Sequence, residues 1–200
     1  MKKLALILLG ISCISYANSQ VLDDFLAHAK TIRADFTQTV ISGKKIRTST
    51  GKMEIARPNK FRWQYLEQQQ LIVSDGQKIY LYDQPLQQVT IKPLGNSLDK
   101  SPAAVLAGAN NLTSLYKINQ LPDQKDKLIW VQIMPKQAND NNGFQSVLLG
   151  FASDKRLDSM KFTDNFGNKT TLKFTNLQTG LALAESDFQF KIPAGADVAQ

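Results

Sequence analysis

Apolar and polar residues alternate with a period of two along most of this chain of 200 residues. For example, Ala34 and Phe36 fall on one side of the chain and Asp35 falls on the other. Successive side chains of a β-strand point to opposite faces, so the pattern predicts strands that each bury one face. The ranges that carry it are 32–40, 46–56, 61–65, 71–74, 78–82, 87–92, 116–121, 128–134, 144–151, 158–163 and 170–177.

The connections between these ranges are short, which predicts that consecutive strands pair in antiparallel order. The dipeptide Asp75-Gly76 favours a tight hairpin between 71–74 and 78–82. Alternation returns once more at 188–192, which predicts a last short strand. Open sheets of about ten strands tend to curl. The fold class expected is therefore mainly β, as an incomplete, half-open antiparallel β-barrel.

Two short apolar helices interrupt the strand pattern. From Val21 to Lys30, apolar residues recur at the spacing of one helix face, and Asp23 lies in the first turn. From Ser101 to Gly108, a Ser-Pro start and a Gly end enclose a small apolar body, which is typical of a capped helix. We expect these helices to form a lid over the open mouth of the sheet.

The N-terminus has the pattern of a secretory signal peptide. Two lysines precede an apolar run, and small residues follow it, so cleavage is expected after Ala17 or, alternatively, after Ser19. Residues 1–17 are then the signal and 18–200 a single exported domain, with the bacterial periplasm as the expected compartment. Cys13, the only cysteine, lies inside the signal. A lipidated Cys13 is the alternative, although the residues before it match a lipidation site poorly.

Basic residues outnumber acidic ones, 24 to 17. They are scattered, with one group at Lys44, Lys45 and Arg47 in and beside a predicted turn. These bases are interpreted as a solvated surface, and attraction to anionic lipid or to an acidic partner is the alternative. Nucleic acid is not an expected partner, because the chain carries an export signal.

The sequence contains little that could support catalysis. His28 is the only histidine, so a periplasmic hydrolase would have to use it. We find no metal-binding spacing and no phosphate-binding glycine loop, so we expect no enzyme activity, no metal and no cofactor. Aromatic residues are instead abundant along the strands. A curved sheet with an apolar concave face and apolar helices above it would form a cavity suited to an acyl chain.

A motif at Arg57–Trp63, with the sequence RPNKFRW, resembles the periplasmic outer-membrane lipoprotein carrier family (LolA). The resemblance includes Gly51-Lys52-Met53 before the motif and Leu71–Gly76, with the sequence LIVSDG, after it. It extends in order over nearly the whole chain after the signal. The further matching segments are 34–38, 82–83, 87–89, 101–108 and 188–193.

The resemblance implies a half-open barrel whose helical lid closes over an apolar cavity. Members of the family accept acylated lipoproteins from an inner-membrane ABC transporter, shield the acyl chains and deliver them to an outer-membrane receptor. The carrier is expected to be a monomer that does no chemistry. A lipidated outer-membrane receptor, or another lipid-binding protein, of the same fold is the alternative.

The resemblance also implies roles for individual residues. Arg57 matches the arginine that holds the lid closed, and its expected partners are main-chain carbonyls around Leu26 and Leu106. An arginine suits this task because it stays charged and offers five donors. The residues implied to line the cavity or to face a partner are Leu26, Phe36, Phe61, Trp63, Ile72, Val105 and Leu106.

Overall fold

A computed structural model describes residues 19–94, 102–108, 112–136 and 144–199 of the chain. The predicted signal peptide, Cys13 and the predicted helix start at Ser101 lie outside these residues. Ser19 lies inside them, is buried and precedes the first helix, where its carbonyl oxygen accepts hydrogen bonds from the amides of Leu22 and Asp23, each 3.0 Å long. Within the described residues, no helix has both the length and the apolar character needed to cross a lipid bilayer.

The first half of the chain forms a meander of six strands. In it, each strand pairs with the next in antiparallel order. The strands are β1 (Thr31–Ser42), β2 (Lys45–Ala56), β3 (Lys60–Tyr65), β4 (Gln70–Asp75), β5 (Lys78–Asp83) and β6 (Gln88–Pro93).

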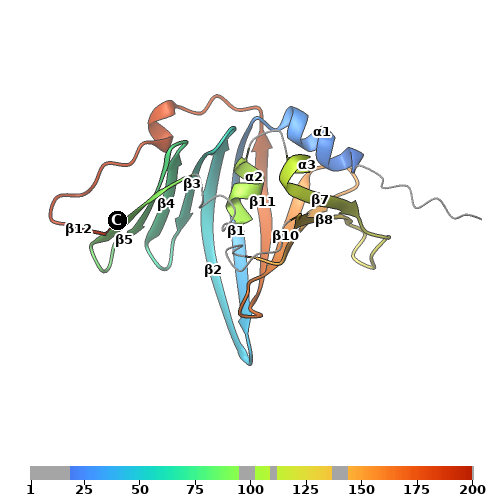
Figure 1. Ribbon diagram of the computed structural model, residues 1–200, viewed down its shortest axis with the longest axis horizontal. Coiled ribbons are helices and arrows are strands. Elements are labelled where there is room, and N and C mark those ends of the chain that lie inside the picture. The colour runs from blue at the N-terminus through green and yellow to red at the C-terminus, as the bar shows by residue number, and fades with distance from the viewer. Residues whose placement is uncertain (1–18, 95–101, 109–111, 137–143, 200) are drawn as a thin grey trace, which may run out of the picture.

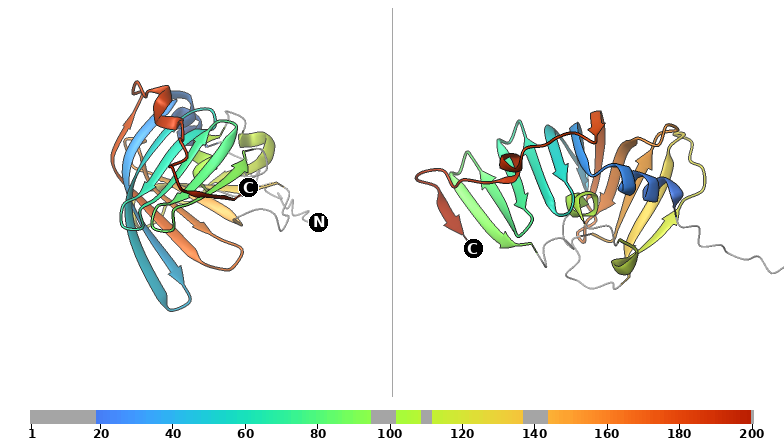
Figure 2. Two further views of the ribbon diagram at one scale, coloured as in Figure 1. Left: turned by 90° about the vertical axis from the view of Figure 1, so that its left-hand side faces the viewer. Right: turned by 90° about the horizontal axis from the view of Figure 1, so that it is seen from above.

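The second half adds a meander of five strands and a short C-terminal strand. The strands are β7 (Tyr116–Gln120), β8 (Ile129–Pro135), β9 (Ser146–Phe151), β10 (Leu157–Thr163), β11 (Lys169–Thr179) and β12 (Asp197–Ala199). Strand β11 pairs with β1, so the two meanders join into one sheet of twelve described strands, with β12 and β7 at its edges. The sheet is strongly curved and does not close (Figures 1 and 2). The predicted mainly β, half-open architecture is confirmed.

Three α-helices, α1 (Gln20–His28), α2 (Pro102–Ala107) and α3 (Leu112–Leu115), lie on the concave side of this sheet (Figure 2). The predicted helices correspond to α1 and α2, whereas α3 was not predicted. Its four residues are too few to show a helical period. Buried residues of α1 and α2 form one apolar core with the concave face of the strands. We call α1 and α2 together the lid.

The predicted strand at 188–192 is wrong. The chain there forms a 3-10 helix, η2 (Glu185–Phe188), then an extended segment, and only later β12, which pairs in parallel with β6. The alternation arises because Phe188 is buried and Phe190 stacks on Tyr80 and Tyr82, with ring centroids 5.4 and 5.8 Å apart. We call residues 185–199 the C-terminal strap.

Candidate functional site

The turn between β2 and β3 contacts both helices of the lid. The backbone amide of Arg57 donates to the carbonyl of Lys30, just beyond α1, over 2.8 Å. Two residues later the amide of Asn59 donates to the carbonyl of Ala107, the last residue of α2, over 2.6 Å. Asn59 has a φ of 68°, a left-handed conformation that asparagine tolerates better than most residues. The turn therefore joins the rim of the sheet to both covering elements.

The segment at the end of β4, which follows the RPN motif in the family resemblance, supports this turn. The hydroxyl of Ser74 is buried and donates to the carbonyl of Asn59 over 2.7 Å. The carboxylate of Asp75 accepts hydrogen bonds from the amides of Gln77 and Lys78, each 2.7 Å long, and so fixes the hairpin that follows. The RPN and SDG segments are thus neighbours that brace one turn, which explains why they occur together in this chain.

The side chain of Arg57 connects the two lid helices. Its Nε donates to the carbonyl of Leu106 over 2.8 Å, and its Nη1 donates to the carbonyl of Leu26 over 3.5 Å. Both carbonyls lie in the last turn of their helix, where no further amide of the helix is available to them. The positive charge also faces the negative end of two helix dipoles. These two carbonyls are at the positions that the resemblance implied, and we call the two bonds the clasp.

The guanidinium group is held in an apolar setting. It stacks over the ring of Phe25, with 5.5 Å between Cζ and the ring centroid. Burial lowers the pKa of Arg57 to about 10, because desolvation disfavours the charged form. The group still carries its charge at neutral pH. Within the described part of the chain its buried Nη2 atom has no hydrogen-bond partner.

The residues implied to line a cavity come together on the concave side of the sheet. Those that are almost fully buried in the core are Phe36, Phe61, Trp63, Val105 and Leu106. Leu26 and Ile72 are partly buried and pack against the same core. The rings of Phe36 and Trp63 are 4.8 Å apart between centroids. The structure thus shows side chains of the lid and of the sheet packed into one core, so the apolar interior is occupied by the protein's own residues.

A glycine makes room for one of these buried aromatic side chains. Gly51 of β2 lies directly opposite Phe36 of β1. A Cβ at this position would collide with the ring of Phe36 and with the carbonyl oxygen of Gln64. The sequence therefore has a glycine where the ring of Phe36 lies against the neighbouring strand.

The prediction from sequence missed several residues that hold α1. Phe25 contacts Arg57 and also packs edge-on against Phe151, at 5.4 Å between ring centroids. On the outer side of the helix, Lys155 Nζ donates to Asp24 over 2.8 Å. The helical spacing marks Phe25 as apolar, but nothing in the pattern shows that its ring meets the arginine.

His28 lies on the exposed side of α1, beside a groove of about 360 Å³. Its Nδ1 is 2.8 Å from the main-chain carbonyl of Asp24. The other residues along the groove are Asp24, Phe25, Ala29, Lys155, Arg156, Leu177 and Thr179. In the described residues the ring is therefore oriented by a carbonyl of its own helix, and no group of three or more metal-binding side chains is found. This arrangement offers no support for the hydrolase alternative.

The fold and the clasp define a class of protein, in which a half-open β-barrel is closed by a helical lid. The family described as "Outer membrane lipoprotein carrier protein LolA" matches residues 27–191. The chain belongs to this family.

Curated relatives cover the chain almost completely. One from Chromobacterium violaceum is 42% identical over 178 residues, which span 88% of this chain and 84% of the relative. One from Methylococcus capsulatus is 39% identical over 202 residues, or 96% and 95% of the two chains. Both bear the name outer-membrane lipoprotein carrier protein. Among solved structures, an uncharacterized conserved protein from Thermus thermophilus is similar in fold, with a TM-score of 0.55 at 12% identity over 90% of this chain and 96% of that one.

Proposed function

We propose that this chain carries acylated lipoproteins and shields their acyl chains against the concave face of its sheet. The observation that carries the proposal is the clasp: one partly buried arginine bonds the last turns of both helices that cover the apolar core. Membership of the lipoprotein carrier family also supports the proposed carrier function. The proposed partners are an inner-membrane lipoprotein-releasing ABC transporter and an outer-membrane lipoprotein receptor. The proposed compartment is the periplasm, and the proposed activity is transport without catalysis.

The clasp suggests a mechanism by which such a carrier could release its bound lipoprotein. Burial of an acyl chain contributes about 0.8 kcal/mol per CH₂ group, so several long chains could be held almost irreversibly. In this protein the same apolar surface is already covered by Leu106, Val105 and their neighbours. Cargo must displace the lid, and the lid must be able to return. Closure by Arg57 competes with the acyl chains and lowers the net affinity for cargo.

The first test is a release assay with the processed protein. Inner-membrane vesicles that contain the transporter and labelled triacylated lipoproteins are incubated with the protein and ATP. We expect a soluble one-to-one complex, whose cargo then moves to outer-membrane vesicles. Omission of ATP is the control for passive extraction of lipoprotein. If a known carrier succeeds in the same vesicles and this protein does not, the proposed function is wrong.

The second test separates the clasp from the fold. Arg57→Leu removes the donors to both helices, whereas Arg62→Leu changes a half-buried arginine of the neighbouring strand and is the matched control. Hydrogen bonds from a charged group contribute about 1.5–3 kcal/mol, so loss of the clasp should slow release of cargo to the receptor roughly ten-fold or more. The control should release cargo at the rate of the unchanged protein. Equal rates for both variants would contradict the role of Arg57.

A further inference from the structure

The far end of the β1–β2 hairpin carries apolar residues where its strand pattern requires polar ones. The solvent-facing side of β1 runs through Arg33, Asp35, Thr37 and Thr39, and then reaches Ile41. Ile46 of β2 lies directly opposite Ile41, so the two side chains share that solvent-facing side. They are 41% and 67% exposed. Two isoleucines on the solvent-facing side lower solubility, and they stand where the alternation predicts polar residues. Such a local departure from the pattern points to a function.

This hairpin end projects beyond the rest of the sheet (Figure 1). The register of β2 with β3 begins only at Gly51, while its register with β1 continues to Lys45. Every residue from 41 to 48 is exposed. The end of the β1–β2 hairpin therefore extends past β3 and is accessible to a binding surface.

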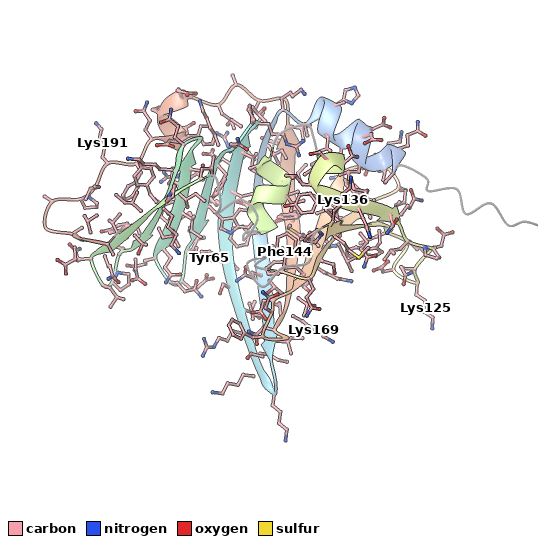
Figure 3. All side chains as sticks on the ribbon, viewed as in Figure 1. Tyr65, Lys125, Lys136, Phe144, Lys169 and Lys191 are labelled. Atoms are coloured by element: carbon pink, nitrogen blue, oxygen red, sulfur yellow. The ribbon has the colours of Figure 1, made fainter. Side chains whose placement is uncertain are left out.

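A second turn adds to the same surface. Lys169 of β11 is the register partner of Ile41, and the turn before it carries Phe166, whose side chain is 92% exposed. Figure 3 shows Lys169 at this projecting end of the molecule. We call the two segments 41–47 and 164–169 together the tip. Its exposed apolar residues are Ile41, Ile46 and Phe166.

The charge at the tip is predominantly positive. Lys44, Lys45 and Arg47 are exposed beside the two isoleucines, and Lys169 adds a fourth base. The carboxylate that lies within the tip belongs to Asp164, which accepts hydrogen bonds from the amides of Phe166 and Asn168. The nearest turn on the β3 side brings Glu67, whose carboxylate is bonded to Thr50. Asp164 thus bonds within its own turn, Glu67 is bonded to β2, and the four bases are exposed.

We propose that the tip binds an anionic phospholipid surface. Apolar side chains on a turn can enter the boundary between headgroups and acyl chains, and flanking Lys and Arg side chains pair with negative headgroups. A protein partner is a poorer fit, because stable protein interfaces bury about 800 Å² on each side. Two narrow turns with three apolar side chains offer far less area than that.

The proposed contact is separate from the cargo site. Ile46 lies near one end of β2 and Arg57 directly follows the other end, a separation of about 35 Å at the rise of a β-strand. A tip on the membrane would leave the lid end of the sheet directed away from the lipid. This inference goes beyond the proposed carrier function and does not depend on the clasp.

The test is flotation of the processed protein with lipid vesicles at low salt. Vesicles of phosphatidylcholine with about 30 mol% phosphatidylglycerol present the anionic surface, and pure phosphatidylcholine is the neutral reference. We expect the protein to float with the anionic vesicles only. The variant Lys44→Gln/Lys45→Gln/Arg47→Gln should lower the bound fraction roughly ten-fold or more, since each base near the surface contributes to binding. The variant Ile46→Ser/Phe166→Ser should also weaken binding.

Matched controls distinguish the tip from net charge and from general surface hydrophobicity. Lys117→Gln/Lys125→Gln/Lys136→Gln removes three exposed bases elsewhere, two of which are labelled in Figure 3. Leu115→Ser/Ile192→Ser removes two exposed apolar residues elsewhere. Both controls should bind like the unchanged protein. Equal losses in the controls, or no flotation of the unchanged protein, would overturn the proposal.

A site-specific probe tests insertion itself. The only cysteine lies in the predicted signal peptide, so Ile46→Cys gives the processed protein a single thiol for a polarity-sensitive dye. We expect the emission to shift to the blue with anionic vesicles, and no shift for a dye at Leu115→Cys. The result that would refute the proposal is a shift at Leu115 without one at Ile46, because vesicles would then bind another face of the protein.

Discussion

The lid and the C-terminal strap are joined to the sheet in different ways. The lid packs buried apolar residues against the concave face, and it is joined to the sheet rim by the Arg57 clasp and by the amide of Asn59. The strap is held by the buried ring of Phe188, by stacking of Phe190 on two tyrosines, by an ion pair between Lys60 and Glu185, and by a strand ladder.

On this difference we interpret the lid as a removable cover and the strap as a permanent one. Within the described residues the lid forms no strand pairing with the sheet, so it can move without breaking a ladder, and acyl chains could cover the apolar residues that it leaves. A strap that buries an aromatic ring and adds a strand to the sheet cannot leave without breaking the sheet edge. We therefore assign motion to the lid and stability to the strap.

The largest expected effect on the free energy of unfolding comes from a substitution in the strap. Phe188→Ala should lower the free energy of unfolding by about 3–5 kcal/mol, because it leaves a cavity where a buried ring packs. Phe166→Ala is the matched control, since its ring is 92% exposed, and it should change stability by less than about 0.5 kcal/mol. Urea denaturation followed by circular dichroism measures both. A loss below about 1 kcal/mol at Phe188 would mean that the strap is not a structural element.

A smaller effect on the free energy of unfolding is expected from a substitution in the clasp. Arg57→Leu should lower the free energy of unfolding by only about 1–2 kcal/mol, because the lost hydrogen bonds are offset by relief of a desolvated cation. The same variant should bind more of an apolar fluorescent dye than the unchanged protein does, since its lid opens more often. Denaturation and dye titration on the same samples give the two values. A destabilisation as large as that of Phe188→Ala would erase the distinction between lid and strap.

The chemistry of the clasp can be tested by pH. The burial that lowers the pKa of Arg57 to about 10 should also lower the pKa of a lysine there, from about 10.4 to the neutral or mildly alkaline range. Below that pKa the lysine of Arg57→Lys is charged and holds the lid; above it, the charge and its contribution to closure are lost. Release of a bound lipopeptide should therefore become slower as pH rises from about 6 to about 8.5 in the variant. The unchanged protein should show no such trend.

The smallest effect on the free energy of unfolding is expected from the ion pair on the outer side of α1. The Lys155 and Asp24 side chains are 58% and 37% exposed, so their ion pair is well solvated. Lys155→Gln should change the free energy of unfolding by less than about 1 kcal/mol, and high salt should remove even that difference. Thermal unfolding at two salt concentrations measures it. A larger, salt-resistant loss would show that α1 is anchored mainly from outside rather than by Arg57.

Much of the fold could be predicted from the sequence because the period-two pattern is strong on the concave face. Ala34 and Phe36 are buried and alternate with more exposed positions as expected. The tail could not be predicted, because Phe188 and Phe190 alternate for packing on other strands rather than for a ladder of their own. Strand β12 has only three residues, all of them exposed, and so carries no apolar pattern to detect.

The site was harder to predict from residues alone. Nothing about an arginine before a proline reveals that its side chain reaches two helices, and that expectation came from the family resemblance. Contacts such as Phe25 with Arg57 depend on how α1 lies across the sheet, which periodicity does not determine. The pairing of Ser74 with Asn59 likewise joins two turns whose proximity follows only from the β3–β4 register.

Hydrogen exchange with and without a triacylated lipopeptide tests the central claim most directly. The lid is predicted to open for cargo while the strap stays closed. Bound lipopeptide should therefore raise amide exchange in Gln20–His28 and at residues 102–107, and leave exchange in Glu185–Phe188 unchanged. Exchange that stays slow throughout the lid while lipopeptide is bound, or that rises first in the strap, would contradict the account.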